Sequence, residues 1–264
     1  VIGYNDSQFG KTGLESAQNF DLLTSNAFFM EKIQNEFKGE KDQGDTVVTT
    51  LDAELQQAAY DALGENKGAV IVMEADTGKI LTLVSKPDFD PNTLAENWEI
   101  LNTDEENSPL LNRATNGSYA PGSVFKIVTA LAYMRQDTDY NSYSYDCQGS
   151  ITEDNVTIRC FNGTVHGYED LRSSFANSCN ASFANIGLSL DVDGYRETAE
   201  SLLFNKKLPS VMDYTKSSFV LDAKSGSAEI MMTAMGQGKT MVSPYHMALI
   251  TETIANGGTL MQPY

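Results

Sequence analysis

The stretch APGSVFKIVTALAYM, residues 120–134, joins a tight turn directly to a strongly apolar segment. A Pro-Gly pair forms the turn, and the run from Ile127 to Met134 has the length of a buried helix, far short of the ~20 residues that span a bilayer. The turn therefore places Ser123 at the N-terminus of the expected helix. Unpaired backbone N–H groups and the positive end of the helix dipole favour developing negative charge at that position.

Ser123 and Lys126 form the only SxxK motif of the chain. Positions i and i+3 share one helical face, so the lysine can reach the serine hydroxyl. A lysine at the start of so apolar a helix is partly desolvated, and desolvation favours its neutral form. A neutral amine beside a hydroxyl is a nucleophile with its base. The alternative from these residues alone is a helix-capping serine followed by a surface lysine.

Ser178-Cys179-Asn180 is the only SxN motif in the sequence. Its hydroxyl and amide, two residues apart, can face one cleft, where they would relay a proton and hold a substrate amide. The alternative is an ordinary helix or loop start, where Ser and Asn are common. No histidine or asparagine constellation activates Cys179, so we interpret it as a buried packing residue.

The upstream pattern predicts a helix followed by a hairpin. Asp52 is a suitable cap for a helix that ends at Gly64. Residues 68–85 contain two β-rich runs around the turn Glu74–Gly78, which is typical of a hairpin. Three further segments are expected to be helical: 170–190, 228–237 and 244–255. Few strands follow the hairpin, and a two-stranded sheet is marginal.

Composition excludes several function classes. The chain has 36 acidic against 18 basic residues and a formal charge of -18, so neither nucleic acid nor an anionic membrane surface is an expected partner. Residues 1–45 have no sustained period and are expected to form a linker or pedestal segment. The chain opens on Val1 rather than Met, and we interpret its N-terminus as cut.

The cysteines and histidines show no metal-ligand spacing. The three cysteines form no CxxC pair and the two histidines are isolated, so no metal site is predicted. Cys147 and Cys160 flank a segment, 151–159, that has the pattern of a short hairpin around Glu153-Asp154-Asn155. Cysteines that face each other across a hairpin lie near bonding distance, which makes this pair a candidate disulfide. Two reduced, half-buried thiols are the alternative.

With these motifs in view, the chain resembles the transpeptidase region of class B penicillin-binding proteins over nearly its whole length. The resemblance implies an α+β fold of the β-lactamase/transpeptidase type, with an antiparallel sheet flanked by helices and a helical subdomain. It assigns residues 46–264 to the transpeptidase domain. The matching stretches are VIGY (1–4), GKTGLE (10–15), TTLDAELQQAA (49–59), GAVIVMEADTGKILTLVSKPDFDPN (68–92), LLNRATNGSYAPGSVFK (110–126), HGYEDLRSSFANSCNASF (166–183) and GQGKTMVSPYHMALITETIANGG (236–258).

The resemblance implies a serine-type D-Ala-D-Ala transpeptidase that crosslinks peptidoglycan stem peptides through an acyl-enzyme. Ser123 would be the nucleophile and Lys126 the general base. Ser178 would relay protons, and Asn180 would hold a substrate side amide. β-Lactams would acylate the same serine, and the backbone N–H of Ser123 would be one oxyanion donor. The resemblance implies no cofactor.

The third motif of the family, a K-[ST]-G strand, has only two imitations in the chain. Lys11-Thr12-Gly13 lies far upstream of Ser123, and Lys224-Ser225-Gly226 precedes GQGKTMVSP and runs into a helical stretch. We interpret both as coincidental. The chain stops at Tyr264, where the family would continue toward this motif, so the fold is expected to lack its last strands and last helix.

Two alternatives of the same fold stay open: a D,D-carboxypeptidase or β-lactamase, and a β-lactam sensor or non-catalytic scaffold. The resemblance implies stem peptides and β-lactam antibiotics as ligands, and other cell-wall synthesis or division proteins as candidate partners. It also implies the extracytoplasmic face of the bacterial cell membrane, reached through an anchor that this sequence does not contain.

Overall fold

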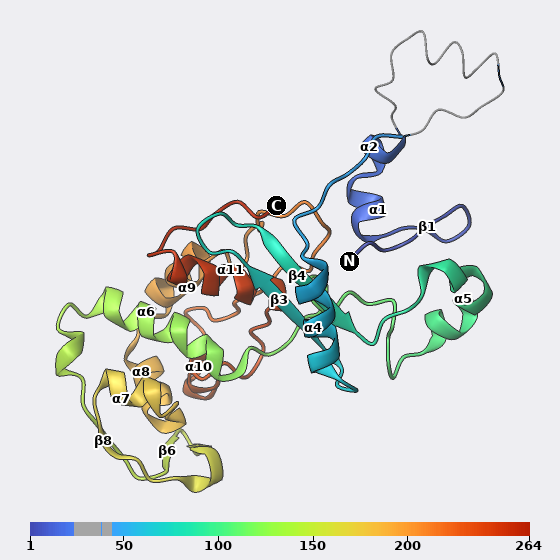
Figure 1. Cartoon of the computed structure of the whole chain (residues 1–264). Coiled ribbons are helices and arrows are strands. Elements are labelled where there is room, and N and C mark those ends of the chain that lie inside the picture. The colour runs from blue at the N-terminus through green and yellow to red at the C-terminus, as the bar shows by residue number, and fades with distance from the viewer. Residues whose placement is uncertain (24–37, 39–43) are drawn as a thin grey trace. The chain divides into compact units, whose positions relative to one another are not determined.

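The computed structural model describes residues 1–23, 38 and 44–264. Their contacts divide the chain into two compact units (Figure 1). Unit 1 comprises residues 1–117, 209–215 and 243–264, and unit 2 comprises 118–208 and 216–242. The predicted boundary at residue 45 stays a prediction, and part of the segment before it lies outside the described residues.

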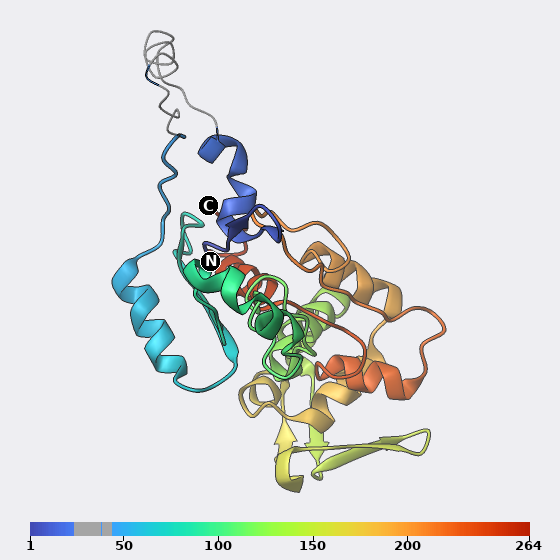
Figure 2. The same ribbon diagram turned by 90° about the vertical axis from the view of Figure 1, so that its right-hand side faces the viewer.

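The centre of unit 1 is the predicted hairpin, β3 (Gly68–Met73) paired antiparallel with β4 (Ile80–Lys86). Helices α4 (Ala53–Leu63) and α11 (Pro244–Ala255) pack on the two faces of this hairpin (Figures 1 and 2). Because both faces are covered, β4 buries side chains on both sides, as its β-branched and leucine-rich sequence predicts.

The predicted cap of α4 is confirmed: the Asp52 carboxylate accepts a hydrogen bond from the Leu55 backbone N–H at 2.9 Å, and Gly64 follows the last turn. The Gln56 side-chain amide then accepts from the Leu83 N–H and donates to the Leu83 carbonyl, each at 2.9 Å. A side chain of α4 thereby satisfies backbone groups of β4 and fixes the helix against the strand.

The remaining elements of unit 1 are short, and two aromatic side chains of its N-terminal segment contact Trp98. The Phe9 ring stacks on Trp98 with centroids 4.1 Å apart, and Tyr4 meets the same indole edge-on. The elements are β1 (Asn5–Asp6), β2 (Gly10–Lys11), α1 (Gly13–Ala17), α2 (Asn19–Leu23), the 3-10 turn η1 (Pro91–Thr93) and α5 (Leu94–Thr103). These aromatic contacts attach the N-terminal segment to α5.

Unit 2 is mainly helical, and two small antiparallel ladders lie at one end of it, beside the helices Leu171–Ala176 and Asn180–Ser189 (Figures 1 and 2). The ladders pair β5 with β8 and β6 with β7. The elements are η2 (Gly122–Phe125), α6 (Lys126–Gln136), η3 (Tyr140–Ser142), β5 (Tyr145–Cys147), β6 (Ser150–Glu153), β7 (Val156–Arg159), η4 (Phe161–Gly163), β8 (Gly167–Glu169), α7 (Leu171–Ala176), α8 (Asn180–Ser189), α9 (Val192–Ser201) and α10 (Ser227–Ala234).

Helix α8 is the buried centre of unit 2. It packs tightly against α10, because a Cβ added at Gly187 would lie 2.5 Å from the Ala234 Cβ. Most of its residues are buried, which agrees with a sequence that is apolar or small on nearly every side. The helix that carries one half of the candidate site is therefore held rigidly by its neighbours.

Most predicted elements are confirmed, with one correction. The segment 170–190 forms two helices, α7 and α8, because Ser178 adopts a left-handed φ of 51° between them. The hairpin around Asp154 and Asn155 is present as β6–β7, with positive φ at both turn residues. None of the helices in the described parts of the chain is long and apolar enough to cross a membrane.

Candidate active site

Ser123 lies exposed in the turn η2, which leads directly into α6. Phe125, two residues later, is fully buried against Phe204 and Phe219 and anchors the turn in the interior of unit 2. The serine is thus on a short 3-10 turn before the helix rather than in the first turn of the helix itself. Its hydroxyl is accessible while its backbone is fixed.

A second loop clamps the serine turn. The Gly122 N–H donates to the Gly236 carbonyl oxygen at 2.7 Å. Gly236 has a φ of 81°, and a Cβ at this position would lie 1.8 Å from the Gly122 carbonyl oxygen. Only glycine tolerates both the left-handed backbone and the close approach. The GQGKT loop therefore defines the position of the nucleophile's backbone.

The Lys126 amine lies at the centre of the candidate site. The side chain is 1% exposed, and Nζ lies 3.3 Å from Ser123 Oγ, 2.9 Å from Ser178 Oγ and 2.7 Å from Asn180 Oδ1. Nζ also lies 2.7 Å from the Ser178 carbonyl oxygen. The two residue pairs singled out from the sequence, 52 or more positions apart, therefore meet at one nitrogen.

Burial lowers the pKa of Lys126 to about 8, and the neighbouring Cys179 and Cys160 offset this effect in part. The Ser178 carbonyl and the Asn180 amide oxygen can only accept hydrogen bonds, so they engage two N–H groups of the amine. The remaining position on the Lys126 nitrogen is close to the hydroxyls of Ser123 and Ser178. In the neutral amine, the lone pair occupies this remaining position and can take a proton from a hydroxyl.

Ser178 and Asn180 are positioned by the break between α7 and α8. The left-handed backbone of Ser178 ends α7, and the Cys179 sulfur accepts from the Ser182 N–H and so caps α8. The Asn180 Nδ2 donates to the Arg159 carbonyl at 3.0 Å. Both ends of the Asn180 amide thus have protein partners in this structure, and its predicted role toward a substrate amide stays a prediction.

Neither imitation of the third motif forms a strand through its three residues. Lys224 and Ser225 lie in a turn bonded to Asp222, and Gly226 is the N-cap of α10. Lys11 ends β2 and Gly13 begins α1. Lys224-Ser225-Gly226 therefore contains no strand residue, and Lys11-Thr12-Gly13 contains only the last residue of β2.

The candidate disulfide is not formed in this structure. Cys147, Cys160 and Cys179 are free thiols, and the sulfurs of Cys147 and Cys160 lie 3.6 Å apart. Cys147 belongs to β5 and Cys160 follows β7, so they do not face each other across the β6–β7 ladder as we expected. Sequence reasoning also missed that Cys179 and His166 join this pair, because none of the four residues shares a motif with another.

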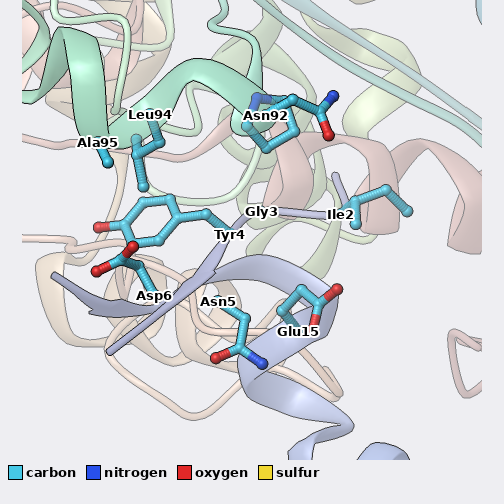
Figure 3. Close-up of a pocket in the computed structure, with 10 residues that line it drawn as sticks. Ile2, Gly3, Tyr4, Asn5, Asp6, Glu15, Asn92, Leu94 and Ala95 are labelled. Atoms are coloured by element: carbon cyan, nitrogen blue, oxygen red, sulfur yellow. The ribbon is translucent and has the colours of Figure 1, made fainter. Parts of the chain in front are cut away.

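Unit 1 contains a separate pocket of about 400 Å³ between the N-terminal segment and the start of α5. Figure 3 shows the Tyr4 ring lying between the Asp6 carboxylate and the α5 residues Leu94 and Ala95. Burial and the Asp6 charge raise the pKa of Tyr4 above its ordinary value. The lining residues include two carboxylates, Asp6 and Glu15, and no nucleophile with its base, so acyl-transfer chemistry is favoured at Ser123 instead.

The chain is similar to known penicillin-binding proteins in sequence and in structure. The family model for the penicillin binding protein transpeptidase domain matches residues 68–264. The peptidoglycan D,D-transpeptidase PbpA of Mycolicibacterium smegmatis is 33% identical over 100% of this chain, which spans 57% of that relative's length. An imipenem acyl-enzyme complex of penicillin-binding protein A from M. tuberculosis is 31% identical with a TM-score of 0.88, over 100% of this chain and 64% of that one. Penicillin-binding protein PBP2 of Helicobacter pylori, solved in complex with MreC, is 26% identical with a TM-score of 0.75, over 81% of this chain and 42% of that one.

Proposed function

Because the chain belongs to the penicillin-binding protein transpeptidase domain family, we propose that it carries the nucleophile and base of a peptidoglycan D,D-transpeptidase. The observation that carries the proposal is the Lys126 amine, which is buried and within 3.3 Å of Ser123 Oγ and 2.9 Å of Ser178 Oγ. The chain spans 57% of the length of its PbpA relative, so the activity of the whole protein is part of the proposal.

In the first step, neutral Lys126 takes the hydroxyl proton of Ser123 as Oγ attacks the carbonyl of the penultimate D-Ala of a stem peptide. The ester bond forms, the peptide bond to the terminal D-Ala breaks, and the leaving amine takes a proton. Ser178 Oγ, 2.9 Å from the same nitrogen, is placed to pass that proton on. The products are an acyl-enzyme and free D-Ala.

In the second step, an amine of a neighbouring strand attacks the ester carbonyl. A new amide bond forms, Ser123 Oγ leaves, and the proton of the amine returns to the serine through Lys126 and Ser178. The Ser123 backbone N–H, fixed by the Gly122–Gly236 hydrogen bond, is one oxyanion donor in both steps. A second donor would come from the family's third motif, with which we do not identify Lys11-Thr12-Gly13 or Lys224-Ser225-Gly226.

The same geometry accounts for covalent inhibition by β-lactams. Their strained amide would acylate Ser123 and leave an ester that is released slowly. The relative solved as an imipenem acyl-enzyme complex supports this part of the proposal. We place the reaction on the extracytoplasmic face of the membrane, where peptidoglycan is crosslinked, and propose a cell-wall synthesis protein as partner, supported by the H. pylori PBP2 complex with MreC.

Turnover separates this function from its alternatives. The full-length polypeptide that contains residues 1–264 is incubated with a D-Ala-D-Ala pentapeptide and an amine acceptor. Release of D-Ala with formation of the crosslinked product is the expected result. D-Ala release with hydrolysis alone would indicate a carboxypeptidase, and stable penicillin binding without any D-Ala release would indicate a sensor. Rapid hydrolysis of penicillin would indicate a β-lactamase.

A further inference from the structure

Three cysteines and one histidine converge where the small ladders of unit 2 meet α8. Cys147 ends β5, Cys160 follows β7, His166 precedes β8 and Cys179 caps α8. One ligand atom from each of the four lies within 4.8 Å of all the others. Four separate segments of the fold therefore direct a soft ligand atom at a common centre.

The spacing of these atoms matches a tetrahedral metal site. The Cys147 and Cys160 sulfurs lie 3.6 Å apart, the Cys160 and Cys179 sulfurs 3.7 Å apart, and Cys147 Sγ lies 3.4 Å from His166 Nδ1. Tetrahedral zinc with Zn–S bonds of about 2.3 Å separates two sulfurs by about 3.8 Å and a sulfur and an imidazole nitrogen by about 3.6 Å. A disulfide would instead bring one pair of sulfurs to about 2.05 Å and leave the third cysteine and the histidine without a role.

The surroundings favour thiolate ligands. All three cysteines are buried, and backbone N–H groups donate to two of the sulfurs. Gly149 N–H donates to Cys147 Sγ and Ser182 N–H donates to Cys179 Sγ, both at 3.4 Å. Such outer hydrogen bonds orient the ligands of a metal site and stabilise their negative charge. The cluster thus has ligands, burial and outer partners.

The cluster is adjacent to the loop that presents the SxN motif. Cys179 lies between Ser178 and Asn180, both of which contact the Lys126 amine. Cys160 follows Arg159, whose carbonyl accepts the Asn180 side-chain amide. An ion held by both cysteines would fix the left-handed turn at Ser178 and the start of α8 at the same time.

We propose that Cys147, Cys160, Cys179 and His166 bind one Zn²⁺ ion as a closed, structural Cys₃His site that holds the Ser178–Asn180 loop. On binding, the three thiols release their protons to solvent and the neutral imidazole donates its Nδ1 lone pair. The set of four protein ligands leaves no open position for water, so the ion takes no part in the acyl transfer. The proposal reverses the sequence-based prediction of no metal site and does not depend on the proposed function.

The test begins with the full-length polypeptide that contains the chain, purified without chelator or a histidine tag. Elemental analysis is expected to find about one zinc per chain. Replacement by Co²⁺ is expected to give the intense visible absorption of tetrahedral cobalt with a sulfur charge-transfer band. The three thiols are expected to resist a thiol reagent until the metal is removed by a chelator.

Variants identify the ligands. Cys160→Ser is expected to reduce bound zinc at least tenfold, while Thr157→Ser, on the exposed face of β7, keeps one zinc per chain. Zinc retained in full by Cys160→Ser would remove this residue from the site. If the variant fails to fold, the cobalt spectrum and thiol protection of the unaltered protein still decide the matter.

Two outcomes would overturn the proposal. A native mass 2 Da below that of the reduced chain, without zinc, would show a disulfide in place of the metal. Protein that stays free of metal and keeps three reactive thiols after incubation with zinc would show that the cluster is only a packed group of thiols.

Discussion

The Lys126 amine nitrogen lies 3.3 Å from the Ser123 hydroxyl oxygen, although the lysine side chain is almost completely buried and the serine is exposed. A buried amine beside an accessible hydroxyl is the arrangement of a base that works on a nucleophile facing substrate. This arrangement leads to two kinds of prediction. One kind tests the acylation chemistry of Ser123 and Lys126, and the other tests the contacts that hold these residues in place.

Replacing Lys126 by Ala removes the proposed general base. We expect the rate of acylation by benzylpenicillin to fall by about 10²–10⁴-fold, the usual range for a lost general base. Acylation is followed by the increase in protein mass with time. Lys224→Ala, in the exposed turn before α10, is the matched control and should leave the rate unchanged. An equal loss in the control would mean that Lys224-Ser225-Gly226 is the third motif after all.

The acylation rate should depend on pH through Lys126. Its pKa is lowered to about 8 by burial, while Cys179 and Cys160 raise it by a smaller amount. The base must be neutral, so the rate should rise with pH up to about 8 and level off above it. Below pH 8 the amine is protonated and the rate should fall about tenfold per pH unit. A rate that is constant between pH 6 and 9 would contradict a titrating base in this range.

Gly236→Ala should loosen the serine turn. The added Cβ would lie 1.8 Å from the Gly122 carbonyl oxygen at a residue whose φ is 81°, so the two loops must separate. We expect a loss of about 1–3 kcal/mol in the free energy of unfolding and slower acylation. Urea unfolding and penicillin labelling measure the two effects. Gly226→Ala is the control, since its Cβ has open space and its φ is -80°.

A buried hydrogen-bond network connects α6 with α9 and α10. Thr129 Oγ1 lies 2.6 Å from Tyr195 OH and donates to the Ala234 carbonyl oxygen at 2.8 Å. Thr129→Val keeps the shape and leaves two buried polar groups unpaired, which should cost about 1–3 kcal/mol in unfolding free energy. Thr157→Val, at an exposed position of β7, should change stability far less. Equal losses of unfolding free energy in the two variants would show that the buried hydrogen bonds of Thr129 do not stabilise the protein.

The sequence predicted those parts of the fold that depend on local chemistry. The Asp52 cap, the hairpin turn at Glu74–Gly78 and the start of the last helix at Pro244 all follow from side-chain capping or turn preference. Helix α9 was missed although the Asp191 carboxylate caps its first turn, because Gly194 and the β-branched and short polar residues of the helix are weak helix formers. The burial of Tyr195, Thr198 and Ala199 depends on tertiary packing, which the local sequence does not specify.

The candidate site was predictable in part. The pairs Ser123–Lys126 and Ser178–Asn180 carry recognisable spacings, and the structure brings both to one amine. The clamp at Gly236 and the Cys₃His cluster depend on contacts between distant segments. Their residues share no motif, so only the folded chain reveals them.

The most direct test of the central claim is the intact mass of the full-length polypeptide after incubation with benzylpenicillin, compared with its Ser123→Ala variant. Ser142→Ala, in the turn η3, serves as the folding-matched control. The account predicts one stable penicillin adduct on the unaltered protein and on the control, and none on Ser123→Ala. An adduct that persists in Ser123→Ala, or that maps to another residue after proteolysis, would contradict it.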